Sequence, residues 1–121
     1  MCHRKIEFIG LISLFLLFIF IQPIKAETDL EAMKYMLLLA QNHLIKIHLD
    51  EPESGLYVEP KLWQKMTHHN KVIFMQNALS FFRQSNELQH KNTEWVGVFD
   101  MTSHSTLGSI DLTRRKFRIN K

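Results

Sequence analysis

The chain contains 121 residues, of which 45% are apolar and 22% are charged, and it carries a formal net charge of +3 and a single cysteine. This length allows one small domain and excludes a two-domain enzyme. The composition excludes a collagen-like repeat and a chain that is disordered by composition.

The N-terminal residues have the parts of a secretory signal peptide. Arg4 and Lys5 form a positive start, residues 8–21 are 14 uncharged and mostly apolar residues, and the small residue Ala26 follows. This pattern predicts a signal peptide over residues 1–26, cleaved after Ala26, and a single mature domain over residues 27–121. We therefore expect an exported protein, either periplasmic or secreted.

An uncleaved anchor is the alternative interpretation of this segment, with residues 8–21 tethering the protein to a membrane. As a helix, the segment would rise about 21 Å, which is less than the roughly 30 Å of the hydrocarbon core and favours cleavage. Membrane contact is expected only through this segment, and only if it is retained. Cleavage would also remove Cys2, and it would lower the net charge to +1, because three of the 15 basic and one of the 12 acidic residues would leave.

The mature chain begins with a predicted helix. Thr28 and Glu31 are spaced as a capping box, and the helix should continue to about Leu49. Apolar residues at spacings of three and four should form its buried stripe. These residues are Leu30, Met33, Leu37, Ala40 and Leu44.

Two further helices are predicted in the middle of the chain. After a turn at residues 50–55 and an extended piece at residues 56–58, Pro60 suits the first position of a short helix. Thr67 can cap a second long helix, in which apolar residues again recur at helical spacing. The polar run at residues 84–93 should form the end of this helix and the following loop.

The apolar period changes to two after Glu94, which predicts strands at residues 95–100, 106–112 and 117–119. Trp63 and Trp95 lie in register with apolar neighbours and are expected in the core. The fold class expected is α+β, with two to three helices packed on a small antiparallel hairpin or three-stranded meander. The signal peptide helix would precede this domain.

Part of the chain resembles small exported bacterial proteins of unknown function. The resemblance consists of Trp63, Lys71, the strand and turn W-V-x-V-x-D-M-x-S at residues 95–103, and the pair Leu107 and Gly108. His104 stands where such hairpins often carry a glycine. The resemblance implies a helix-then-hairpin layout and no particular activity.

Histidines are the candidate metal ligands of the mature chain. Zinc needs three or four ligands that converge on one point. His68 and His69 are adjacent at the start of a predicted helix, so they would need His90 or His104 brought close by the fold. A solvated or capping role is the favoured interpretation, and no metal or other cofactor is expected.

A basic patch lies near the C-terminal end of the sequence. Arg114, Arg115, Lys116 and Arg118 follow Asp111 with no further acidic residue. Such a patch can meet anionic lipid, a polyanion or an acidic partner, and the alternative, which is favoured, is a solvated turn and chain end. No nucleic-acid partner is expected, because export removes the chain from nucleic acid and no recognition motif accompanies the patch.

No set of residues has the spacing of a catalytic site. Asp100, Ser103 and His104 include the residue types of a nucleophilic triad, but neighbours in a tight turn cannot adopt its geometry. The sequence therefore predicts a non-enzymatic exported accessory domain that binds an unknown protein of the cell envelope. The alternative is a metal- or small-ligand-binding envelope protein that uses its histidines.

Overall fold

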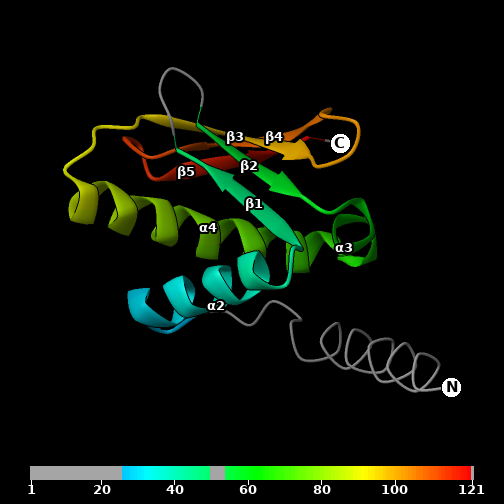
Figure 1. Ribbon diagram of the computed structural model, residues 1–121, viewed down its shortest axis with the longest axis horizontal. Helices are drawn as coiled ribbons and strands as arrows, with labels where there is room; N and C mark the ends of the chain where they lie inside the picture. The colour runs from blue at the N-terminus through cyan, green and yellow to red at the C-terminus, as the bar shows by residue number, and fades with distance from the viewer. Residues whose placement is uncertain (1–25, 50–53, 121) are drawn as a thin grey trace, which may run out of the picture.

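The computed structural model describes residues 26–49 and 54–120 and shows a five-stranded sheet with helices on one face (Figure 1). The elements along the described chain are α2 (Asp29–Gln41), β1 (Ile45–His48), β2 (Gly55–Val58), α3 (Pro60–Lys65), α4 (His68–Gln89), β3 (Trp95–Asp100), β4 (Thr106–Asp111) and β5 (Lys116–Ile119). The predicted α+β class is confirmed. The predicted signal peptide helix lies outside the described residues.

Helix α2 begins at the predicted capping box but ends well before Leu49. Thr28 Oγ1 accepts a hydrogen bond from the Glu31 N–H at 3.2 Å, and Glu31 Oε2 accepts one from the Glu27 N–H at 3.0 Å. His43 then adopts a left-handed conformation, with φ of 59°, and Leu44 N–H donates back to Leu39 O at 3.0 Å. This is the Schellman pattern of a helix end, here with histidine in place of the usual glycine.

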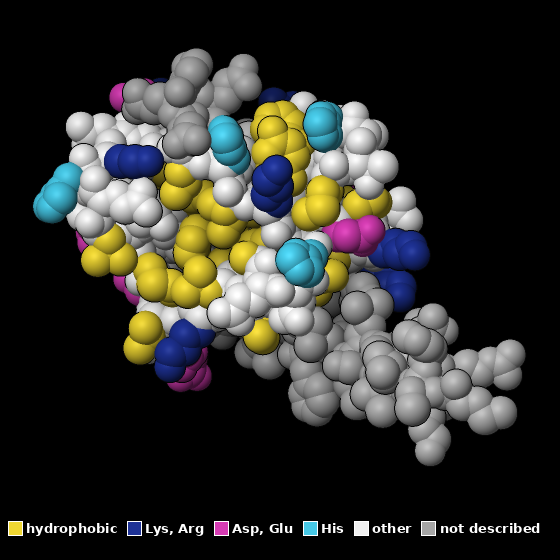
Figure 2. Space-filling model, viewed as in Figure 1, with side chains coloured by type: hydrophobic (Ala, Val, Ile, Leu, Met, Phe, Trp, Pro, Cys, Tyr) yellow, Lys and Arg dark blue, Asp and Glu magenta, His cyan; other side chains and the backbone are white. Residues whose placement is uncertain are grey.

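The face of α2 that is buried differs from the predicted stripe. Ala32, Met36 and Leu39 are buried, whereas Leu30 and Leu37 are 59% and 45% exposed. Figure 2 shows apolar side chains gathered at the surface over this part of the molecule. Because apolar residues occupy most sides of this helix, the periodicity does not select one face, and packing against α4 does.

Strand β1 corrects the predicted C-terminal part of the first helix. Ile45 and Ile47 alternate with Lys46 and His48, which suits a strand with one buried side. β1 pairs antiparallel with β2, with Ile45 opposite Val58. The expected extended piece is thus a strand with its own partner, and the sheet has two more strands than predicted.

The helical layer arises from the connection between β2 and β3, which are parallel neighbours. Parallel strands need a crossover, and α3 and α4 form it. Pro60 opens α3 and Thr67 caps α4, as predicted, with Thr67 Oγ1 accepting from the Asn70 N–H at 3.2 Å. α4 continues to Gln89, so residues 84–89 of the polar run predicted to be helix end and loop are helical.

The three predicted C-terminal strands are confirmed as the antiparallel meander β3–β4–β5. The strand order across the sheet is β1-β2-β3-β4-β5, so β3 is central and β1 and β5 are the edges. The sheet is therefore mixed, not purely antiparallel.

The core lies between the sheet and helices α2 and α4. Its largest fully buried side chains are Phe74, Phe82, Met36, Leu39, Leu56, Met75, Ile110, Val58, Val96 and Val98. Trp63 is buried, as predicted, and its ring meets that of Phe74 edge-on at 6.1 Å. Within the described ranges, no helix is both long and apolar enough to cross a bilayer.

Candidate functional site

The face of the sheet opposite the helices has no described element packed over it. Inward-pointing residues such as Val58, Val96 and Ile110 are buried, so their neighbours along each strand point to the other side. We call this side the outer sheet face. Its larger polar and aromatic side chains are Lys46, His48, Tyr57, Trp95, Phe99, Ser109, Lys116 and Arg118.

Aromatic rings form the centre of the outer sheet face. Tyr57 and Phe99 are partners across β2 and β3, with ring centroids 5.4 Å apart, and the ring of His104 also contacts Tyr57, with centroids 5.6 Å apart. The Phe99 ring lies over Gly97, where a Cβ atom would come within 2.6 Å of Phe99 Cε2. Gly55 stands directly opposite Gly97, so the two glycines together leave the space that this ring occupies.

Trp95 is the most exposed aromatic residue of this face, and its predicted core position is wrong. Its side chain is 58% exposed, whereas its neighbour Val96 is fully buried. The sequence shows correctly that residues of β3 alternate, but both alternating sets contain large apolar residues. The helices lie on the side of Val96 and Val98, which leaves Trp95 on the outer side together with Phe99.

The fold divides the predicted basic patch into three parts. Lys116 and Arg118 are exposed on the outer side of edge strand β5. Arg114 lies in the β4–β5 turn and pairs with Asp111, with Arg114 Nε 4.0 Å from Asp111 Oδ2. Arg115 instead lines a hollow beside α4.

The outer sheet face is therefore both aromatic and basic. Lys46 on the opposite edge strand adds a third cation to Lys116 and Arg118. The acid in the same rows, Asp111, is buried and already accepts a hydrogen bond from the Arg114 N–H at 3.0 Å. Such a surface can stack on flat groups and attract anionic ones.

The candidate histidine ligands are not gathered by the fold. His68 and His69 are exposed in the first turn of α4, and His104 lies in the β3–β4 turn against Tyr57. Across residues 26–49 and 54–120, no group of three or more His, Cys, Asp or Glu side chains is placed to hold a metal ion.

Asp100 stabilises the turn after β3. Its Oδ1 accepts hydrogen bonds from the backbone N–H groups of Thr102 and Ser103, at 2.8 and 2.9 Å. The Ser103 N–H, above all, holds the pKa of the Asp100 carboxyl below its usual value. The carboxylate thus orders the hairpin through backbone N–H groups, and the ring of His104 packs on Tyr57.

Sequence reasoning missed Lys46 and Tyr57 as members of the outer sheet face, and it missed Arg83, which lines the hollow beside α4 together with Arg115. The alternation of Lys46 with two isoleucines was a signal for the first, because it is the pattern of a half-buried strand. Arg83 gave no signal, because it is a single cation within a predicted helix, far along the chain from the basic patch.

These features define a small α+β domain with one open sheet face that is aromatic and basic. Comparisons of the chain with protein-family models, curated proteins and solved structures give no match.

Proposed function

We propose that the protein is an exported accessory domain that binds another protein of the cell envelope through the outer sheet face, without catalysing a reaction. The observation that carries this proposal is the exposure of Trp95 on the same sheet face as the Tyr57–Phe99 pair. Tryptophan, tyrosine and arginine are the residues that dominate binding energy at protein interfaces. Arg118, on the same face, completes this set.

The charge of the face suggests the kind of partner surface. Lys46, Lys116 and Arg118 lie at the two edges of the sheet, with the aromatic rings between them. A partner with an apolar centre and an acidic rim would match this arrangement, and its charge would mainly affect the rate of association. Export is supported by the pattern of residues 1–26 in the sequence.

Site-specific crosslinking of the full chain in its own host tests the binding surface. A photoreactive amino acid placed at Trp95 should give one dominant protein adduct, and the same residue at Leu88 should not. Leu88 is a matched control because it is apolar and 72% exposed, but lies on α4. Adding Arg118→Glu should reduce the adduct at position 95.

Adducts of equal yield at both positions, or none at position 95, would refute the proposed surface. N-terminal sequencing of the protein recovered from the envelope or the medium tests export separately. A start at Glu27 is expected, and recovery of the protein only with an intact N-terminus would contradict cleavage.

A further inference from the structure

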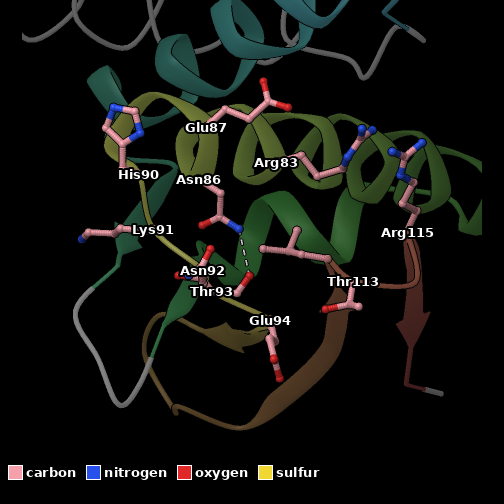
Figure 3. Close-up of a pocket in the computed structure, with 11 residues that line it drawn as sticks. Arg83, Asn86, Glu87, His90, Lys91, Asn92, Thr93, Glu94, Thr113 and Arg115 are labelled. Carbon is pink, nitrogen blue, oxygen red and sulfur yellow. Dashed lines mark hydrogen bonds between the residues drawn. The ribbon is translucent and has the colours of Figure 1, made fainter.

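A second candidate site lies beside the C-terminal half of α4. A hollow of about 850 Å³ is bounded by α4, the loop that follows it and the β4–β5 turn (Figure 3). None of its lining residues belongs to the outer sheet face. An inference drawn from it is therefore independent of the proposed function.

Two arginines from different elements meet in this hollow. Arg83 comes from α4 and is half-buried, and Arg115 comes from the β4–β5 turn. Figure 3 shows both guanidinium groups at the same end of the hollow. Neither forms an ion pair with an acidic side chain of the described residues, whereas Arg114 next in sequence does. Two guanidinium groups brought together without an anion repel each other, and a bound anion would relieve this.

The other charged groups of the hollow do not take the place of that anion. Glu87 and Glu94 also line it, but within the described residues neither forms an ion pair with the two arginines, and in Figure 3 the Glu94 carboxylate points away from them. Lys91 Nζ donates to Leu49 O at 3.2 Å, so this ammonium group is held by the chain itself. The anion-binding part of the hollow is thus the end formed by Arg83 and Arg115.

The backbone at Arg115 is an independent sign that its side chain is needed. Arg115 has φ of 58°, in the left-handed region that favours glycine. A left-handed residue after a type I turn is common in hairpins, and glycine fills it most easily. Strained conformations of this kind are more frequent at functional sites. His90, also in the wall of this hollow, has φ of 52° for a different reason, because it is the left-handed end of α4 and its N–H donates to Asn86 O and Glu87 O.

The floor of the hollow is ordered and contains a polar group without a partner. Asn86 Nδ2 donates to Thr93 O at 2.8 Å and fixes the loop after α4 (Figure 3). Thr93 Oγ1 is the one buried side-chain oxygen or nitrogen in the described part of the chain that has no hydrogen-bond partner. This oxygen is enclosed by the chain and does not face the open space of the hollow, so the groups that can bind an anion there are the two arginines.

We propose that this hollow binds a small soluble phosphate monoester, with its phosphate group held between Arg83 and Arg115. A phosphate monoester carries close to two negative charges at neutral pH, which matches two guanidinium groups. Arginine binds phosphate through paired N–H donors in a planar fork. A single carboxylate would neutralise only one of the two arginines.

Calorimetry with inorganic phosphate on the purified full chain, in mild detergent at constant ionic strength, tests the site. Phosphate should bind with a dissociation constant in the millimolar range or below, and chloride should not compete. Arg83→Gln and Arg115→Gln should each weaken binding by about tenfold or more. Arg114→Gln is the matched control, because it removes a cation from the same turn but not from the hollow; it should change binding by less than about twofold.

Arg115→Gly separates binding from folding, since glycine suits this backbone but lacks the guanidinium group. Phosphate binding should be lost while the thermal unfolding midpoint stays the same or rises. The proposal is overturned if wild type shows no phosphate binding, or if Arg114→Gln weakens binding as much as Arg115→Gln. It is also overturned if the chain prefers vesicles that contain phosphatidic acid over phosphate in solution and Arg115→Gly abolishes that preference, because the ligand would then be a lipid head group.

Discussion

The contact between Phe99 and Gly97 gives a quantitative test of how the outer sheet face is built. In Gly97→Ala, the new Cβ atom would lie 2.6 Å from Phe99 Cε2, whereas ordinary contacts begin at 3.4 Å. Phe99 Cζ lies closer still, so the ring must move by about 1 Å or rotate away from the sheet. That movement would disturb its packing on Tyr57, whose ring centroid is 5.4 Å away.

Two opposing terms determine the size of the effect. Overpacking of this kind costs about 1–3 kcal/mol, and replacing glycine by alanine within a strand recovers about 0.5–1 kcal/mol through the unfolded state. We expect Gly97→Ala to lower the free energy of unfolding by about 1–2 kcal/mol. In a Phe99→Ala background the clash is absent, so the same change should raise the free energy of unfolding by about 0.5–1 kcal/mol. The coupling between the two positions should be about 2 kcal/mol.

Urea unfolding of the four proteins of this double-mutant cycle provides the measurement, with the midpoint compared at constant slope. Gly55→Ala is a useful control, because its Cβ would lie 3.3 Å from the same ring and should cost less. An equal loss for Gly97→Ala in both backgrounds would show that Phe99 does not determine the need for glycine at this position.

Three further changes test other parts of the structure. Thr67→Ala should lower the free energy of unfolding by about 1 kcal/mol, because it removes the hydroxyl that caps α4. Thr67→Ser retains a hydroxyl and should keep most of that stability. Thermal melts of the two variants provide the measurement, and equal losses in both would contradict the capping role. The pKa of Asp100 is lowered in the folded protein, so its contribution to stability is present above about pH 3.9 and is lost as the pH falls below that value. Asp100→Asn should therefore make the free energy of unfolding less dependent on pH on the acid side. An unchanged slope would oppose this. Burial raises the pKa of Tyr35, so its contribution to stability is present below about pH 10 and is lost as the pH rises further. Tyr35→Phe should remove this loss of stability at alkaline pH. A variant whose stability falls with alkaline pH as steeply as that of wild type would disprove the assignment.

Elements whose signals are local could be predicted from the sequence. The caps at Thr28 and Thr67 act on N–H groups three residues further along the chain, and Pro60 suits a first helical turn through its own ring. The alternation in residues 95–100 also placed β3 correctly. Strand β1 was missed because its hydrogen bonds are made with β2 and its apolar residues continue the helical pattern of α2, although the alternation of Lys46 with two isoleucines was a short local signal for it.

For the candidate sites, the sequence predicted which residue types are present but not which residues lie together. The basic character of residues 114–118 is evident from the sequence, as is the presence of aromatic residues in β3. Which of them act together depends on sheet order and on which side the helices cover. The position of the helices leaves Trp95 on the surface, and the fold brings Arg115 into the same hollow as Arg83, which is distant in sequence.

The sequence by itself therefore determined the helix starts, the C-terminal strands, the α+β class and the local charge of the chain's end. Each depends on atoms within a few residues of one another or on simple periodicity. The tertiary structure decided the mixed five-stranded sheet, the exposed face of α2, the open aromatic sheet face and the arginine-lined hollow. The physical reason is that a face becomes buried or exposed only when segments distant in sequence pack against it.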